Sequence, residues 1–241
     1  MDLSTARHLN QLTSDFYAQV HTSFDATRQA PWPGWTRVRN ALRAVEPQNP
    51  SKTTKVLDLA CGNLRFERYL MRDEPNLQAW AVDNCVSLAQ VSEPSNVTFQ
   101  ELDIVNTLLS GRDLCAAIAA PLCDLSVCFG FLHHVAMPEH RQAVLRALVE
   151  HTRSGGLVAV SLWQLEKSPR ILAKARPLED KGDYLLGWQN QTNVWRYCHS
   201  FSEHEVDLLA LGVSDVAREV ARFSADGKTD DLNRYILLQV M

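Results

Sequence analysis

VLDLACGNLRF, residues 56–66, is an apolar strand that passes through Asp58 into a turn of small residues and then into a helix. In open α/β sheets, ligands bind beyond the carboxyl ends of the strands at turns of this kind. Ala60 and Gly62 leave the backbone uncovered, so a ligand can approach it closely, and the next helix offers unpaired N–H groups. The stretch predicts a cofactor site at Asp58, Ala60, Gly62 and Asn63, with a dinucleotide-binding turn as the competing interpretation.

Outward from that turn, strands and helices alternate along the chain. Strands are expected at residues 55–61, 79–85, 97–104, 123–131 and 155–163, and helices at 65–72 and 138–152. This alternation predicts a parallel sheet with helices on both faces. Two further strands, at 215–223 and 234–241, have no room for a helix between them and should form an antiparallel hairpin. A mostly parallel seven-stranded sheet with a C-terminal antiparallel hairpin strand resembles the Rossmann-like fold of class I methyltransferases.

The whole chain, residues 1–241, is expected to form a single α/β domain, since ~200–250 residues is a normal size for one. Residues 1–50 should form an N-terminal helical cap, because apolar residues recur at helical spacing from Leu9 to Phe24. Residues 55–164 should form the cofactor-binding core. Residues 165–241 should form a substrate-side segment that includes the hairpin.

Charge and composition argue against several classes of protein: strongly basic nucleic-acid binders, membrane and secreted proteins, and proteins with a cysteine metal site. The net charge of −4 gives no global basic footprint for nucleic acid. Runs of ~18 apolar residues and a secretory signal pattern are absent, which predicts a cytoplasmic protein with no membrane span. The six cysteines contain no C-x-x-C pair, so free thiols are expected rather than a metal site.

Acidic residues follow the next two strands. Asp83, with its neighbour Asn84, ends the second strand about 20 residues past the turn, where an acidic group accepts hydrogen bonds from ribose hydroxyls. Asp103 and Ile104 end the third strand. In methyltransferases an acidic residue there pairs with the adenine amine and its neighbour packs on the ring. The alternatives are a helix N-cap for Asp83 and a plain loop aspartate for Asp103.

Two motifs resemble sequence elements of methyltransferases, and the first differs from its element at two positions. The turn resembles E/D-x-G-x-G-x-G, with Ala60 and Leu64 in place of the first and third glycines. The fourth strand runs into Phe129 and the histidine pair His133–His134, like the element that closes the cofactor site in this class. The resemblance implies that Phe129 and His134 contact the cofactor, S-adenosylmethionine. A structural role is the alternative for either histidine.

Four segments, in order, resemble a narrower family, the tRNA wobble-uridine carboxymethyl methyltransferases, which include the methyltransferase domain of the AlkB-homologue tRNA hydroxylase. They are FYAQVHTSFDATRQAPWP (16–33), the histidine-pair segment through LWQLEK (132–167), GDYLLGW (182–188) and RYCHSFSEHEVDLL (196–209). The long insertion of eukaryotic members before GD…W is nearly absent, which indicates a bacterial or otherwise distant member.

The resemblance implies methyl transfer from S-adenosylmethionine to a carboxylate on a modified tRNA wobble uridine. A carboxylate is already anionic at neutral pH, so no general base is needed, but burying it requires a cation or several donors. Arg196 and His199 are the predicted catalytic groups. Arg28 would bind the cofactor's carboxylate or a tRNA phosphate, with a surface salt bridge as the alternative. The predicted substrate-binding aromatics, each with a core role as the alternative, are Trp32, Trp163, Trp188 and Tyr197.

The family resemblance also implies tRNA and a small zinc-binding activator subunit as partners. Two other functions stay open. One is a methyltransferase acting on a small-molecule carboxylate or another oxygen or nitrogen acceptor, which the acidic composition favours. The other is a cofactor-binding regulatory protein without turnover, against which Asp83, Gly62 and the RY-x-H segment argue.

Overall fold

The computed structural model describes residues 1–45, 52–89, 96–189 and 191–241, and its centre is a seven-stranded sheet in the order β3-β2-β1-β4-β5-β10-β9. Its parallel strands are β1 (Thr54–Leu59), β2 (Leu77–Asp83), β3 (Val97–Glu101), β4 (Cys123–Cys128) and β5 (Thr152–Trp163). β10 (Asn233–Val240) runs antiparallel to β5 and to β9 (Ala217–Ala225). The predicted mostly parallel sheet with an antiparallel hairpin is confirmed.

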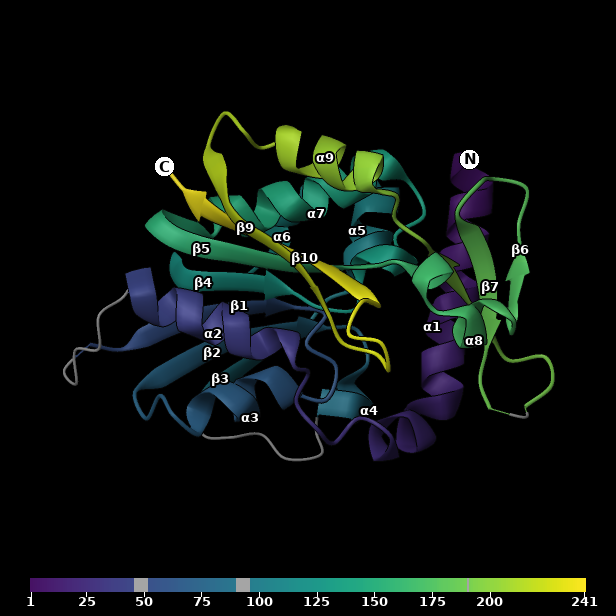
Figure 1. The fold of residues 1–241 in the computed structure, drawn as a ribbon, viewed down its shortest axis with the longest axis horizontal. Helices are drawn as coiled ribbons and strands as arrows, with labels where there is room; N and C mark the ends of the chain where they lie inside the picture. The colour runs from purple at the N-terminus through teal and green to yellow at the C-terminus, as the bar shows by residue number, and fades with distance from the viewer. Residues whose placement is uncertain (46–51, 90–95, 190) are drawn as a thin grey trace.

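Helices cover both faces of this sheet (Figure 1). One face carries α5 (Ile104–Leu109), α6 (Leu114–Ala117), α7 (Pro138–Glu150) and α9 (Glu203–Leu211). The other carries α2 (Gly34–Val45) and α3 (Arg65–Met71), and the short α4 (Val86–Ala89) follows β2. Each face has its own apolar cluster, one built on Val144, Leu148 and Val160 and the other on Trp35 and Phe66.

The predicted limits of several strands shift. The third strand ends at Glu101 instead of residue 104, because Asp103 caps α5, which begins at Ile104. The fourth strand ends at Cys128 instead of residue 131, because Gly130 turns the chain with a positive φ of 68°. β5 begins at Thr152, earlier than the predicted Gly-Gly turn. It pairs with Cys123 at Thr152 and with Leu125 at Leu157, and the irregularity between these pairs accommodates the glycines within the strand.

A second, three-stranded sheet was not predicted from the sequence. It comprises β6 (Ala175–Pro177), β7 (Asp183–Gly187) and β8 (Trp195–His199), all antiparallel, and follows the short helices η2 (Leu165–Lys167) and α8 (Pro169–Leu172). Its strands have only three to five residues and mixed polarity, which is too short for a clear period-2 signal.

The N-terminal helix α1 (Leu3–Ala26) packs against the core of the large sheet through Ala6 and Leu9 and against the small sheet. Asp2 caps it by accepting a hydrogen bond from the Thr5 N–H, and one apolar stripe that includes Phe16 and Val20 is buried. In Figure 1 the helix lies beside the small sheet, and the Thr13 hydroxyl accepts a hydrogen bond from the peptide N–H of Tyr197 in β8 at 3.1 Å. The predicted N-terminal cap thus lies against the predicted substrate-side segment. Within the described residues, no helix is long and apolar enough to span a membrane.

Candidate active site

The turn after β1 has an unusual backbone. Ala60, Gly62 and Leu64 all have positive φ, at 62°, 56° and 57°. These are the three positions where the methyltransferase motif carries glycine, so the backbone keeps the glycine conformation although two residues have side chains. A left-handed conformation costs a non-glycine residue about 1–2 kcal/mol. Leu64 is fully buried against Cys61 and Ala81, and this packing offsets part of that cost.

Asp83 holds this turn in place from the end of β2. Its two carboxylate oxygens accept hydrogen bonds from the peptide N–H groups of Gly62 at 2.9 Å and Cys85 at 2.8 Å. Burial raises the pKa of the Asp83 carboxyl, and these bonds oppose that rise. The aspartate therefore orders the turn after β1 and the chain after β2 around the pocket, and its predicted role toward the ribose stays a prediction.

Asp103, beyond β3, both caps a helix and lines the pocket. It is the N-cap of α5, and its carboxylate accepts a hydrogen bond from the Asn106 N–H at 2.8 Å. Together with Ile104 it also lines the pocket. Its predicted role toward adenine stays a prediction.

A buried carboxyl pair lies under the turn. Asp58 lines the pocket and contacts Glu67, the third residue of α3, which is completely buried. Burial raises the pKa of both carboxyls, that of Glu67 to about 7. The pair therefore holds a proton near neutral pH. Sequence reasoning missed Glu67, whose only signal was its distance of nine residues from Asp58.

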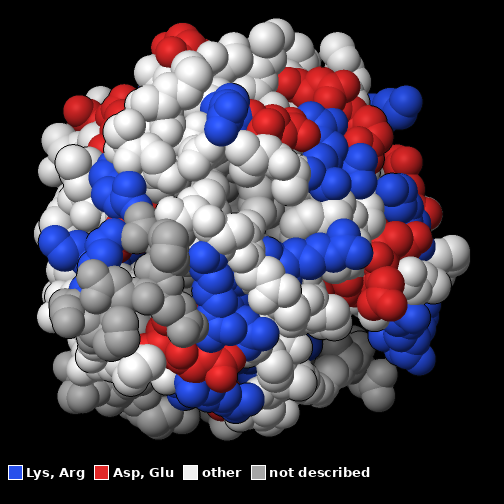
Figure 2. All heavy atoms as spheres, turned by 60° about the vertical axis from the view of Figure 1, so that its left-hand side comes forward, with Lys and Arg blue, Asp and Glu red and all other residues white. Residues whose placement is uncertain are grey.

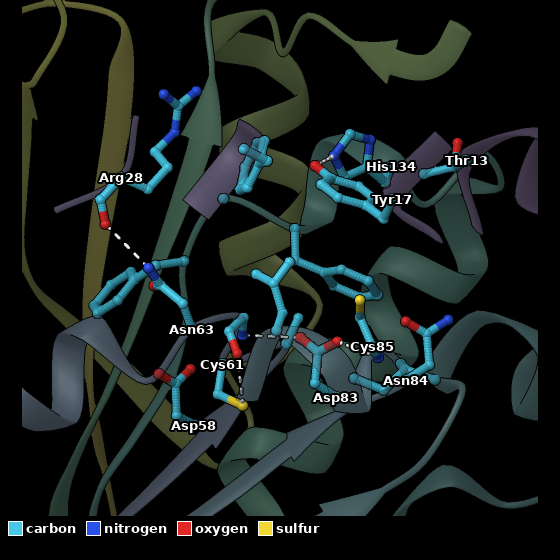
Figure 3. A pocket seen from close by; sticks show the side chains of 18 of the residues that line it. Thr13, Tyr17, Arg28, Asp58, Cys61, Asn63, Asp83, Asn84, Cys85 and His134 are labelled. Atoms are coloured by element: carbon cyan, nitrogen blue, oxygen red, sulfur yellow. Dashed lines mark hydrogen bonds between the residues drawn. The ribbon is translucent and has the colours of Figure 1, made fainter. Parts of the chain in front are cut away.

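The pocket lies at the carboxyl ends of β1, β2 and β4 and is closed on one side by α1 (Figure 3). The Asn63 amide donates to the Asp25 carboxylate at 2.7 Å and to the Arg28 carbonyl at 3.0 Å, which ties the end of α1 to the turn. Predicted residues that line the pocket are Arg28, Trp32, Asp58, Ala60, Gly62, Asn63, Asp83, Asn84, Asp103, Ile104, Phe129 and His134. The structure therefore brings together every predicted cofactor residue.

Arg196 lies in an aromatic cage beside this pocket. The carbon of its guanidinium is 4.5 Å from the centre of the Phe16 ring, 5.8 Å from that of Trp188 and 6.0 Å from that of Trp163. The residue is 3% exposed, and its Nε and Nη1 have no hydrogen-bond partner within the described ranges. A buried, unpaired guanidinium is costly unless an anion joins it.

A second arginine flanks the same tryptophan. The guanidinium of Arg28 lies 4.8 Å from the Phe24 ring centre and 6.0 Å from that of Trp188. Burial, and in smaller part repulsion from Arg196, lowers the pKa of Arg28. Trp188 itself is fixed by its indole N–H, which donates to the Ser23 hydroxyl at 2.8 Å. Two positive charges therefore converge on one aromatic wall of the site, which favours an anionic ligand there.

His199 and Tyr197 lie elsewhere. They are separated from Arg196 by odd numbers of residues in β8 and so lie on the opposite strand face. The ring nitrogens of His199 hydrogen-bond to Asp183 at 2.5 Å and to Glu205 at 2.7 Å. The Tyr197 hydroxyl donates to Asp183 at 2.7 Å. The pocket lining in the described part of the chain includes neither residue, so the predicted joint action of Arg196 and His199 on one substrate finds no support in the geometry.

Two of the remaining predicted aromatics also differ in their surroundings. Trp32 lines the pocket and packs on Gly130, where a Cβ would lie 2.9 Å from the indole. Trp163 is 9% exposed and stacks on the His133 ring with centroids 3.9 Å apart. The other ring neighbour of Trp163 is Arg196, so its predicted role toward a substrate stays a prediction, and the stack is compatible with the structural role that was the alternative for His133.

His133, His134 and Cys198 offer ligand atoms within 4.8 Å of one another. Three observations argue against a cation there. His134 Nδ1 is 2.6 Å from the Tyr197 carbonyl, burial raises the pKa of the Cys198 thiol to about 11, and Arg196 shares the strand face of Cys198. We assign no metal to this cluster. All six cysteines are free thiols.

Comparison with known proteins gives two kinds of relative, although no model of a known protein family matches. The chain is similar to the tRNA (carboxymethyluridine(34)-5-O)-methyltransferase ALKBH8 of Mus musculus, with 26% identity over 185 residues, 75% of this chain and 22% of the relative. The same protein of Macaca fascicularis is 24% identical over 231 residues, 92% of this chain and 30% of the relative. The chain thus spans less than a third of the length of these relatives.

Solved structures match over almost the whole chain. An S-adenosylmethionine-dependent methyltransferase from Clostridium acetobutylicum has 13% identity and a TM-score of 0.58, with 94% of this chain and 98% of that one covered. CalS10, an amino pentose methyltransferase from Micromonospora echinaspora with bound S-adenosylmethionine, has 12% identity and a TM-score of 0.60, with 91% and 95% covered.

The comparisons confirm the predicted family resemblance and the class I fold. The similar proteins described above are all named as methyltransferases, and CalS10 has S-adenosylmethionine bound, in agreement with the predicted enzyme class.

Proposed function

We propose that this methyltransferase esterifies a carboxylate carried by a modified wobble uridine of tRNA. The observation that carries the proposal is Arg196, a buried guanidinium with two unpartnered nitrogens beside the cofactor pocket. The named activity of the ALKBH8 relatives, on carboxymethyluridine 34 of tRNA, supports the same acceptor class. A carboxylate is the simplest group that would pair with Arg196 and then accept a methyl group.

The residues of the pocket fit S-adenosylmethionine. Gly62 lies on a turn where even an added Cβ would meet nothing nearer than Leu88 at 4.0 Å, so the backbone there is open to a ligand. Asp83 and Asp103 would hold the ribose and the adenine, and Asp58, which contacts the buried Glu67, would face the cofactor's ammonium group. When bound, S-adenosylmethionine supplies a methyl group activated by positively charged sulfur.

The chain's own task is then to bind and desolvate an anion. At neutral pH a carboxylate needs no proton removed before it attacks. Arg196 would pair with it, the cage of Phe16, Trp163 and Trp188 would exclude water, and Arg28 would add a second positive charge. Positioning of the two reactants accounts for the catalysis in this scheme. His199 would not contact the acceptor and would instead hold β8 in place through its hydrogen bonds with Asp183 and Glu205.

The alternative acceptor is a small-molecule carboxylate. Charge favours it: the chain carries a net −4, and the face in Figure 2 has its Lys and Arg side chains interspersed with Asp and Glu. A tRNA acceptor fits a cytoplasmic location and would draw on a partner surface, for which the family resemblance implies a small zinc-binding activator.

Nucleoside mass spectrometry of tRNA from strains with and without the gene tests the proposal. We expect the deletion strain to accumulate a wobble uridine with a free carboxyl group in place of its methyl ester. An unchanged tRNA profile together with an accumulating small carboxylic acid would instead establish the alternative.

The purified chain gives the residue-level test. Arg196→Ala should retain S-adenosylmethionine affinity within about threefold, because Arg196 lies outside the pocket lining, and should lose transfer. Arg176→Ala is the matched control, since that guanidinium covers the Trp195 ring in the small sheet, away from the pocket. Loss of cofactor affinity in Arg196→Ala would remove Arg196 from the acceptor site.

A further inference from the structure

Tyr197 follows Arg196 in β8, and all three of its polar groups are bonded. Its peptide N–H donates to the Thr13 hydroxyl of α1 at 3.1 Å, and its carbonyl oxygen lies 2.6 Å from Nδ1 of His134. Nε2 of His134 lies 2.9 Å from the Tyr17 hydroxyl, which ties the same strand to α1 a second time. The Tyr197 side chain is completely buried. The residue next to the proposed acceptor group is therefore held on all sides.

Charged side chains hold the Tyr197 hydroxyl on the face of β8 opposite the acceptor group. Nη2 of Arg141 in α7 donates to that hydroxyl at 3.2 Å, and the hydroxyl donates to the Asp183 carboxylate of β7 at 2.7 Å. His199 links Asp183 to Glu205 of α9, at 2.5 Å and 2.7 Å. The Glu205 carboxylate lies 3.7 Å from Nη1 of Arg141, which closes a circle. We call these five residues the polar ring.

The positions of the protons in the polar ring follow from its partners. Arginine can only donate, so the Tyr197 oxygen accepts from Arg141 and its own proton goes to Asp183. Burial would raise the pKa of the Glu205 carboxyl, but hydrogen bonds, chiefly with His199, lower it to about 2. Both imidazole nitrogens of His199 thus face carboxylate oxygens, which accept and do not donate. Both nitrogens therefore carry hydrogen, and His199 is an imidazolium.

The polar ring then contains two cations and two carboxylates and is electrically balanced. Arg141, Asp183 and His199 are each at most 5% exposed, and removing one member of a buried charged set leaves its partner uncompensated. Arg141 also donates to the carbonyl oxygens of Val135 at 2.7 Å and Ala136 at 3.1 Å, directly after the histidine pair. The ring therefore joins β8 to the segment that lines the cofactor pocket.

We infer that Tyr197 is a positioning residue that holds Arg196 beside the cofactor pocket, and that the polar ring keeps Tyr197 in place. Side chains alternate along β8, so the ring acts on Arg196 through the backbone and not by contact. A misplacement of about 1 Å at reacting groups can cost about a hundredfold in rate, so a small loss of support is measurable. The inference rests on the proposed role of Arg196 and holds for either class of acceptor.

Tyr197→Phe tests the inference because it removes only the hydroxyl. Calorimetry with S-adenosylmethionine gives the affinity and the number of binding sites per chain, and methyl transfer to tRNA from a strain that lacks the gene gives kcat per site. We expect affinity and site number within about twofold of the natural chain, and kcat per site lowered about tenfold. A purely structural role would reduce the number of sites and leave kcat per site unchanged, and that result would overturn the inference.

Tyr235→Phe is the matched control. Tyr235 is likewise completely buried, and its hydroxyl donates to the Asp226 carboxylate at 2.5 Å. It belongs to β10, and within the described ranges it does not line the pocket. Its kcat per site should equal that of the natural chain. An equal fall in Tyr235→Phe and Tyr197→Phe would overturn the inference.

The charge of His199 has its own spectroscopic signature. In a chain with ¹⁵N-labelled histidine, both imidazole nitrogens of His199 should show a directly bonded hydrogen at pH 7, and His199→Gln identifies these signals by their loss. A single protonated nitrogen would overturn the polar ring, even if Tyr197→Phe does not fold. A natural chain that binds S-adenosylmethionine but methylates no carboxylate would contradict the proposed function instead, so the two failures are distinguishable.

Discussion

Glu67→Gln should make the fold less sensitive to alkaline pH. Burial raises the pKa of the Glu67 carboxyl from 4.5 to about 7. Since the folded-state value lies above the ordinary one, ionisation opposes folding: the penalty is absent below about pH 4.5, grows as the pH rises through 7, and is then constant. At 1.36 kcal/mol per pH unit, this interval corresponds to about 3 kcal/mol. Glutamine has nearly the same shape and no charge, so the variant escapes the penalty.

Urea unfolding at pH 5 and pH 8 measures the effect. We expect Glu67→Gln to match the natural chain at pH 5 within about 1 kcal/mol and to exceed its free energy of unfolding at pH 8 by about 1–3 kcal/mol. Glu101→Gln, at an exposed position, should keep the pH dependence of the natural chain. A difference between Glu67→Gln and the natural chain that does not change with pH would refute the assignment of a shared proton to Asp58 and Glu67.

Three further changes test other parts of the structure by denaturant unfolding. Ala60→Gly should raise the free energy of unfolding by about 0.5–1 kcal/mol, because glycine tolerates the φ of 62°. A lower free energy of unfolding in this variant would contradict the backbone strain assigned to Ala60. Gly111→Ala, at a φ of 69° with open space around it, should lower it by about 1 kcal/mol, and an unchanged value would oppose the same reasoning. Burial alone would raise the pKa of the Glu205 carboxyl, but hydrogen bonds, chiefly with His199, lower it to about 2. The ionised carboxylate therefore stabilises the fold above about pH 4.5. Glu205→Gln should therefore cost about 1 kcal/mol at pH 7, discounted for solvent screening, and the cost should disappear as the pH falls toward 2.

Most of the cofactor half of the site was readable from the sequence because its residues lie in or shortly after the carboxyl ends of strands. Asp83 is the last residue of β2 and Asp103 lies two residues past β3, and parallel strands bring such ends to one edge of the sheet. The left-handed conformation of Ala60 and Leu64 was not predicted from the sequence, although both stand at glycine positions of the motif. Glu67 could not be found this way, since a charged residue in the first turn of a helix is ordinarily exposed.

The acceptor half was harder to predict because it depends on contacts between distant segments. The cage around Arg196 joins α1, β5 and the segment after β7, and the Tyr17–His134 bond spans 117 positions. Arg196 and His199 were grouped because they are near in sequence. Once residues 195–199 form a strand, the alternation of side chains separates them.

The most direct measurement of the central claim is a transfer assay with the purified chain, S-adenosylmethionine carrying a labelled methyl group, and tRNA from a strain that lacks the gene. An ester of a carboxylate is hydrolysed by mild alkali, whereas methyl groups on ring nitrogen or carbon are not. We predict that label enters the tRNA at the wobble uridine and is released as methanol by mild alkali, and that Arg196→Ala abolishes incorporation. Label that withstands alkali, or incorporation that survives loss of Arg196, would contradict the account.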